Sequence, residues 1–147
     1  MRMNLLSAAM RRIGDTIEKN TVAKAKITAD ATVRLLVERT PVDTTEAVSN
    51  WQLTLNSPAD RVNPPFVPGK GGSTATASRL IATTAALRVL EGYTRSDQEI
   101  FITNPAPYIS ELNDGKSNQA PAGFIEEAIN EGRRASSAIR LLRRGLF

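Results

Sequence analysis

The chain begins with a long segment in which apolar residues recur at helical spacing. Residues 3–39 contain no proline and a single glycine, Gly14. Apolar side chains three and four positions apart mark one face of an amphipathic helix. We therefore predict a helix over residues 3–39, with Gly14 and Asn20 as the places where it could bend. Thr40 and Pro41 should end it, because a residue before proline avoids the α region. The apolar face comprises Leu6, Ala9, Met10, Ile13, Ile17, Ile27, Ala29, Val33, Leu36 and Val37.

The pattern then changes to short alternating stretches and two further helices. Alternation of apolar and polar residues predicts strands over residues 50–56 and 98–104. Helical spacing over residues 76–91 predicts a middle helix, with Gly92 placed to end it. A last helix is predicted over residues 121–142, because Pro121 suits a first helical position, although Gly132 should cost up to about 1 kcal/mol relative to alanine. These elements predict an α+β fold, in which a small antiparallel sheet packs against the long N-terminal, middle and C-terminal helices.

Residues 57–75 form a proline- and glycine-rich segment, which we call the arm. It holds four of the eight prolines in the chain, and irregular segments of this length are uncommon inside compact domains. Two interpretations stay open, an exposed arm that becomes ordered on a partner and plain disorder. Because a sheet of two strands is marginal on its own, either residues 61–67 add an edge strand or neighbouring subunits supply more strands.

Length and composition limit the class of protein. A chain of 147 residues, 41% hydrophobic and 23% charged, fits a single folded domain over residues 1–147. Cysteine and histidine are absent, which removes thiolate nucleophiles, the commonest general base and the commonest metal ligand. We therefore predict no enzyme, no catalytic residues, no metal and no cofactor. Charges interrupt any signal-like segment and no apolar run could span a membrane, so we expect an aqueous, reducing setting.

A dense run of turn-forming and polar residues over 105–120, which we call the motif loop, joins the second strand to the last helix. It exceeds the roughly four to six residues of an ordinary connection. Gly115, Lys116 and Ser117 are similar to the end of a phosphate-binding loop, but Ser110 stands where that loop needs its first glycine, so we reject a nucleotide site. The spacing of nearby acidic residues fixes neither a metal site nor an acid–base pair; these residues are Asp43, Glu46, Glu111 and Asp114.

Four side chains are candidates for specific contacts. The carboxylate of Asp43 suits a turn or helix cap, where it would accept backbone N–H groups. Trp51, the only tryptophan, should pack in the core, with interface anchoring as the second interpretation. Tyr108 is the better interface candidate, since its ring can be buried while its hydroxyl bonds across a contact. For Glu111 a bridge between subunits and a solvated charge stay equally open.

The end of the chain is basic. No acidic residue follows Glu131, and the formal net charge of the whole chain is +4. Arginines near a helix C-terminus complement the helix dipole, whereas contact with a polyanion or an acidic protein surface is the functional alternative. The arginines concerned are Arg133, Arg134, Arg140, Arg143 and Arg144.

The order of the motifs resembles a family of virion proteins. Residues 40–44, Thr-Pro-Val-Asp-Thr, precede Trp51; later come Ile-Phe-Ile-Thr-Asn over 100–104, Tyr108, Glu111, Gly115, and Gln-Ala-Pro-Ala-Gly-Phe over 119–124. This order resembles the tail-completion and head–tail joining proteins of long-tailed bacteriophages, the group that includes the lambda-type minor tail protein Z. The match covers about residues 40–128.

The chain departs from the family pattern in three places. Thr45 stands where the family has a glycine, so we expect the turn there to use a different backbone geometry. Asn50 separates Ser49 from Trp51, where the family has an adjacent Ser-Trp pair. A leucine follows Glu111 instead of preceding it, which leaves the partner of Glu111 open.

The resemblance implies a structural protein of the phage neck, made in the host cytoplasm and carried in the virion. It implies a homo-oligomeric, hexameric ring through which DNA passes, in contact with tail terminator or tail tube proteins and with head connector or stopper proteins. The arm would suit docking on these neighbours, and the basic residues could touch passing DNA without reading its sequence. The residues we expect at interfaces are Asp43, Trp51, Tyr108, Glu111, Gly115, Gln119, Pro121 and Phe124.

An alternative function is that of a small basic architectural DNA-binding protein, which would bind duplex DNA tightly and in a salt-dependent way as an isolated chain. A hydrolase is a distant third hypothesis. Without histidine or cysteine, it would need a site built from carboxylates and a metal ion.

Overall fold

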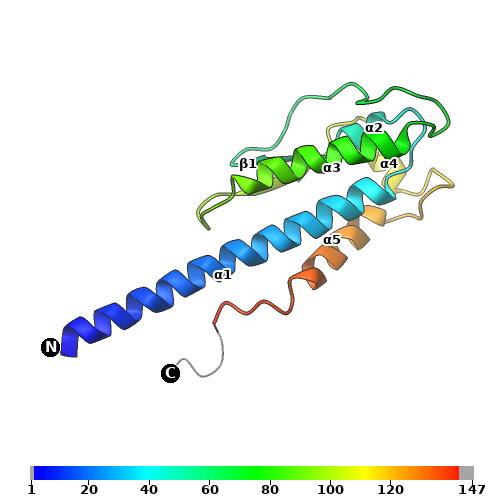
Figure 1. Cartoon of the computed structure of the whole chain (residues 1–147). Coiled ribbons are helices and arrows are strands. Elements are labelled where there is room, and N and C mark those ends of the chain that lie inside the picture. The colour runs from blue at the N-terminus through cyan, green and yellow to red at the C-terminus, as the bar shows by residue number, and fades with distance from the viewer. Residues whose placement is uncertain (1, 143–147) are drawn as a thin grey trace.

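The computed structural model describes residues 2–142 and has the predicted α+β fold (Figure 1). The first helix forms the spine of the molecule, the last helix packs along one side of it, and the middle helix with the sheet packs along the other. The elements in chain order are α1 (Arg2–Arg39), α2 (Glu46–Ser49), β1 (Gln52–Leu55), α3 (Ala75–Glu91), β2 (Ile100–Thr103), α4 (Ile109–Asn113) and α5 (Phe124–Ala135).

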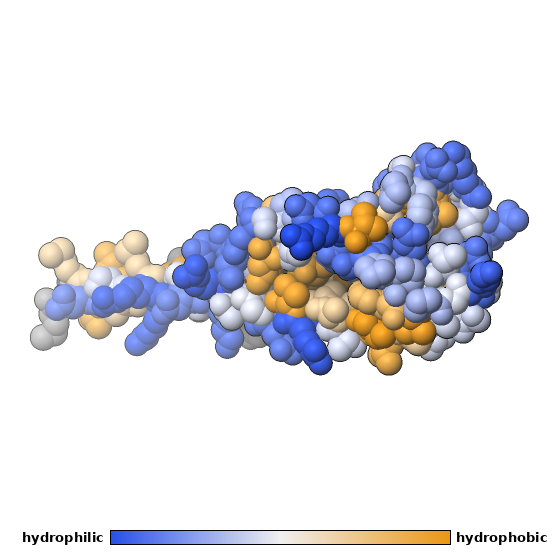
Figure 2. Space-filling view, turned by 90° about the horizontal axis from the view of Figure 1, so that it is seen from above, coloured by the Kyte–Doolittle hydropathy of each residue, from blue (hydrophilic) through white to orange (hydrophobic). Residues whose placement is uncertain are grey.

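Helix α1 confirms the predicted long helix and runs without interruption through Gly14 and Asn20. Only its C-terminal half is built into the core, where Ala29, Val33 and Leu36 are buried. The N-terminal half projects beyond the body (Figure 1), and hydrophobic residues lie among hydrophilic ones along it (Figure 2). The helix therefore has two environments, one packed and one exposed.

The sheet is an antiparallel pair of short strands. β1 pairs with β2 so that Gln52 lies opposite Thr103 and Leu55 opposite Ile100. Within residues 2–142 the sheet consists of these two strands, so residues 61–67 do not add an edge strand. Its stability comes from packing, since β1 lies against α3 and Leu53 is only 3% exposed.

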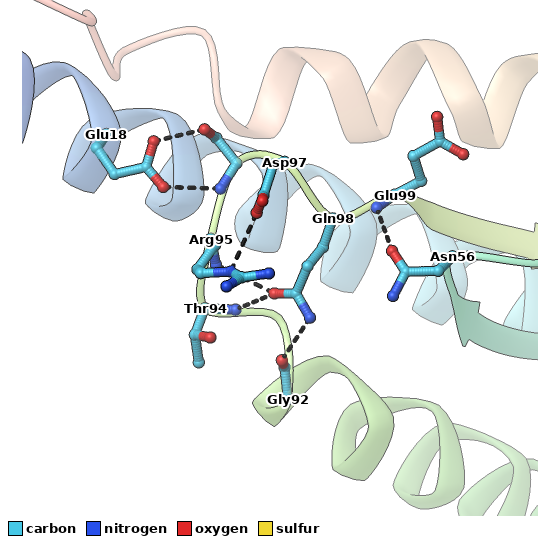
Figure 3. Close-up of polar contacts among 9 residues, drawn as sticks. Glu18, Asn56, Gly92, Thr94, Arg95, Asp97, Gln98 and Glu99 are labelled. Atoms are coloured by element: carbon cyan, nitrogen blue, oxygen red, sulfur yellow. Dashed lines mark hydrogen bonds and ion pairs between the residues drawn. The ribbon is translucent and has the colours of Figure 1, made fainter.

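Strand β2 begins at Ile100, two residues later than predicted, because Gln98 closes the preceding turn (Figure 3). The side-chain oxygen of Gln98 accepts the backbone N–H of Thr94 at 2.8 Å, and its amide donates to the carbonyl of Gly92 at 3.3 Å. The same turn is fixed to α1, because the N–H of Ser96 donates to the carboxylate of Glu18 at 2.8 Å. The hydroxyl of Ser96 also donates to this carboxylate, and this bond, together with the bond from the N–H, lowers the pKa of Glu18.

The arm has no helix or strand before Ala75, but hydrogen bonds hold its central part against the domain. Asn50 and Asn63 make reciprocal bonds, with Asn63 N donating to Asn50 Oδ1 at 2.6 Å and Asn50 Nδ2 donating to the Asn63 carbonyl at 3.0 Å. Further along, Phe66 N donates to Ser49 Oγ at 3.0 Å and Val67 N to Ser78 Oγ at 3.1 Å. Docking of the arm on a partner would therefore start from an ordered segment.

Helix α5 is shorter than the predicted 121–142. It begins at Phe124 because Gly123, with φ of 79°, adopts the left-handed conformation and its N–H donates to the Asn113 carbonyl at 2.7 Å. Pro121 thus belongs to the preceding turn and not to the first helical position. The helix ends after Ala135, where the hydroxyl of Ser136 bonds to that of Thr28 at 2.6 Å.

Helices α1 and α5 approach closely at one glycine. A Cβ atom added to Gly132 would lie 1.8 Å from Thr32 Oγ1 and 3.0 Å from Thr32 Cβ. Beyond this crossing, Arg39 donates to both carboxylate oxygens of Glu131, at 2.8 and 2.9 Å. The glycine that lowers helix propensity is therefore what lets the two helices pack.

Candidate functional site

The candidate site is a cleft of about 270 Å³ between the end of α1 and the motif loop. One wall is formed by the segment after α1 and the start of α2, and the other by residues of the motif loop. Segments more than 60 residues apart in sequence thus face each other, as 47 and 108 do. The cleft is lined by Pro41, Val42, Asp43, Thr44, Thr45, Glu46, Ala47, Tyr108, Leu112, Ser117 and Gln119.

The first wall is anchored in the core through Thr40. Its hydroxyl donates to the Leu36 carbonyl at 2.6 Å and accepts the indole N–H of Trp51 at 2.6 Å. Thr40 is 0% exposed and Trp51 5% exposed. Trp51 therefore has the core role that the sequence favoured, and it is not an accessible interface anchor.

Thr45, on this wall, stands where the family that the chain resembles has a glycine, so a different backbone geometry is predicted there. Its φ is 69° and its ψ 1°, the left-handed conformation that favours glycine, so the prediction of a different backbone geometry is wrong. The side chain is buried, and its hydroxyl donates to the carbonyl of Val67 in the arm at 3.0 Å. A β-branched residue at positive φ is strained by about 1–2 kcal/mol, which this bond helps to offset.

Asp43 accepts a backbone N–H, as predicted, but from the arm. Its Oδ1 accepts the N–H of Gly71 at 2.8 Å, and its own carbonyl accepts the N–H of Gly72 at 3.0 Å. Both glycines have positive φ, of 60° and 73°. The glycine-rich end of the arm is thereby fixed to the rim of the cleft.

The second wall is tied to the first by Gln119. The backbone N–H of Val42 donates to Gln119 Oε1 at 2.9 Å, and Gln119 Nε2 donates to the Val42 carbonyl at 3.1 Å. One amide side chain thus satisfies both polar groups of a residue 77 positions away. Of the predicted contact residues, Gln119 has the clearest structural role.

Tyr108 reaches across the cleft toward Glu46. Burial raises the pKa of the Tyr108 phenol to about 12, and the charge of Glu46 and a hydrogen bond to it add to this effect, while a backbone hydrogen bond from Ala47 opposes it. The sequence did not pair these residues. Glu46 is the first residue of α2, a helix of four residues. A helix this short shows no sequence periodicity from which the direction of the Glu46 side chain could be predicted.

The other predicted contact residues lie in different surroundings. Glu111 is exposed and pairs with Lys116 on its own loop at 3.5 Å. Gly115 turns the loop with φ of 87°, and a Cβ there would lie 3.1 Å from Ala122 Cβ. Pro121 is exposed. Phe124 is 0% exposed and packs in the core, so it is not accessible to a partner.

The basic residues lie away from the cleft. Arg133 and Arg134 are exposed on the last turn of α5, and Arg140 is exposed beyond it. Arg143 and Arg144 lie outside the described residues. Exposure leaves the three described arginines accessible to an anionic partner, and it equally fits solvated side chains near a helix C-terminus.

The cleft offers hydrogen-bonding groups and negative charge. Among residues 2–142, no group of three or more acidic side chains lies close enough together to hold a metal ion. Over the same residues, no helix is long and apolar enough to cross a membrane. What the lining can do is accept donors, through the carboxylates of Asp43 and Glu46.

Comparisons with known protein families, with curated proteins and with solved structures found no match. The resemblance to phage neck proteins therefore rests on the residues themselves.

Proposed function

We propose that the protein is a structural component of the neck of a long-tailed phage, where copies of it form a ring that completes the tail and joins it to the head. The observation that carries the proposal is the cleft. Two of the segments that carry the resemblance, residues 40–44 and the part of the motif loop from 108 to 119, contribute to its opposite walls and are tied together by Gln119. Shared motifs that meet in one surface are better explained by a common contact than by separate turns.

The size and chemistry of the cleft suit a protein partner. A volume of about 270 Å³ lies just below the roughly 300–1,000 Å³ of typical small-molecule sites. It is large enough for one inserted side chain or a tight turn. Asp43 and Glu46 in the lining favour a lysine or arginine from the neighbour, through a charge-assisted hydrogen bond.

The exposed arginines fit the same proposal in a secondary role. In a ring around the DNA path, Arg133, Arg134 and Arg140 could contact phosphates without reading sequence. Binding of this kind would be weak and sensitive to salt. Tight duplex binding by the isolated chain at low salt, lost when these arginines are changed to alanine, would instead favour an architectural DNA-binding protein.

The decisive experiment removes the protein from the phage that encodes it and supplies variants in trans. Without the protein, electron microscopy should show filled heads and separate tails, and wild-type protein should restore joined, infectious particles. Thr44→Arg should fail to restore them, because Thr44 is exposed on the cleft wall and an arginine there would fill the space and repel a basic partner side chain.

Thr76→Arg is the matched control for this experiment. It introduces the same side chain at an exposed threonine on α3, away from the cleft, and should restore infectivity. Joined, infectious particles in the complete absence of the protein would refute the proposed function. Equal activity of Thr44→Arg and wild type would refute the role of the cleft.

A further inference from the structure

The projecting half of α1 carries an apolar stripe that nothing in the described chain covers. Met3, Leu6 and Met10 are 84%, 63% and 64% exposed, and Ile13 and Ile17 continue the stripe toward the body with partial exposure. The hydroxyls of Ser7 and Thr16 bond back to carbonyls of the same helix. Isolated helices of this length are marginal in water, so an exposed apolar stripe on one calls for a partner.

The spacing of the stripe is that of a coiled-coil seam. Positions 3, 6, 10, 13 and 17 alternate steps of three and four residues, an average period of 3.5. A helix that packs on a broad core has a wider apolar face, with a third position per heptad. Here only two positions per heptad are consistently large and apolar. The stripe therefore fits a single partner helix better than a broad protein surface.

The residues beside the seam fit a second copy of the same helix. The four flanking positions hold small, uncharged residues, which are Ser7, Ala9, Gly14 and Thr16. Between residues 3 and 19, every charged side chain lies at a position turned away from the seam, and these are Arg11, Arg12, Asp15, Glu18 and Lys19. Within residues 3–19, a second copy of the same helix would thus meet no like charge and no bulky flank, and the one charged flanking residue, Arg2, lies just before the seam.

The chain itself covers this face of α1 only beyond Ile17, where α1 enters the body of the molecule. Asn20 and Lys24 continue the alternating spacing, and they donate to the carbonyls of Leu141 and Ile139, at 3.0 and 3.4 Å. From this point on, the C-terminal segment and then α5 lie along α1 (Figure 1). The stripe that remains open is thus a continuation of a face that is already used for packing.

We infer that copies of this chain associate through the projecting half of α1, with the seam from Met3 to Ile17 packed against the same seam of a second copy. The inference goes beyond the proposed function, because a helix pairing of this kind would form whatever the assembled protein does. It also separates two surfaces on one chain, a self-association seam at one end and the cleft at the other.

Leu6→Glu and Leu5→Glu form a matched pair for testing the seam. The two leucines are adjacent and similarly exposed, at 63% and 68%, but Leu5 lies off the seam. Sedimentation equilibrium of the full chain should show association for the natural protein and for Leu5→Glu, and loss of association for Leu6→Glu. Trp51 fluorescence should remain that of a folded body in both variants, because both positions precede Glu18, where α1 is hydrogen-bonded to the turn after α3.

Cysteine variants give a second readout, because the natural chain contains no cysteine. If the seams pair in parallel, Leu6→Cys should form an intermolecular disulfide under mild oxidation faster than Leu5→Cys. If they pair antiparallel, Met10→Cys, near the middle of the seam, should instead form the disulfide fastest. The inference would be overturned if the natural chain stayed monomeric. In that case another protein, or the C-terminal residues of the same chain, would cover the stripe. An oligomer that Leu6→Glu leaves intact would also overturn the inference, although such a ring would be compatible with the proposed function.

Discussion

Replacing Gly132 by alanine tests how α1 and α5 are held together. The new Cβ would lie 1.8 Å from Thr32 Oγ1, 3.0 Å from Thr32 Cβ and 3.2 Å from the Thr28 carbonyl oxygen. Rotating Thr32 would remove only the first contact, and it would break the bond from Thr32 to the Thr28 carbonyl at 2.6 Å. The other two atoms are fixed to the α1 backbone, so the helices must move apart.

The expected loss follows from two opposing effects. Overpacking a well-packed contact costs about 1–3 kcal/mol, whereas alanine in place of glycine favours the helix by up to about 1 kcal/mol. The net decrease in the free energy of unfolding should therefore be about 1–2 kcal/mol, the middle of the roughly 0–3 kcal/mol that these two ranges allow. For a domain of this size, that lowers the melting temperature by roughly 2–8 °C.

Thermal and urea denaturation followed by circular dichroism would measure this change. Gly14→Ala is the control, because no atom lies within 4 Å of the added Cβ, and it should increase helicity or stability. Adding Thr32→Ala to the Gly132→Ala variant should recover part of the loss, since it removes the closest atom. The packing argument would be refuted if Gly132→Ala were at least as stable as the natural chain.

Three further predictions concern the cleft and its support. In an ultraviolet pH titration Tyr108 should ionise near pH 12, and the Glu46→Gln variant should lower the pKa of Tyr108. Because this folded-state pKa lies above the ordinary value of about 10, the contribution of Tyr108 to stability should be complete below pH 10 and be lost as the pH rises toward 12. Trp51→Phe should lose about 1–3 kcal/mol in urea denaturation, since it leaves Thr40 without the indole bond and part of the ring volume empty; an unchanged midpoint would contradict this. Thr45→Gly should change stability by less than about 1 kcal/mol, because relief of backbone strain offsets the lost hydrogen bond. Thr45→Ala keeps a Cβ at positive φ and should cost about 1–2 kcal/mol; a Thr45→Gly variant less stable than Thr45→Ala would argue against strain.

The periodic elements could be predicted from the sequence. The stripe along α1 and the alternation in β1 and β2 are repeated signals, and each depends only on neighbours in the chain. Element ends were less certain, because they depend on single side chains with distant or unusual partners. Gln98 closes a turn instead of starting β2, and the left-handed Gly123 moves the start of α5 past Pro121.

The candidate site could be predicted only in part. Tyr108 and Gln119 were identified as contact residues, but their partners were not, because Glu46 and Val42 lie 62 and 77 positions away with no pattern linking them. Phe124 shows the opposite difficulty. An aromatic residue beside an exposed loop looks like a contact residue until its burial is known.

The packing of α1 against α5 also constrains when the protein can fold. The face of α1 that holds Thr28 and Thr32 is covered by residues near 132–136, which are synthesised long after α1. Until then α1 lacks its partner α5, although the two-stranded sheet and α3 can already pack against the other side of α1. Contacts between such distant residues are slow to form because loop closure costs entropy. Stable folding must therefore wait until α5 has been synthesised, and a nascent chain with α5 still in the ribosome would expose surface that chaperones and proteases recognise.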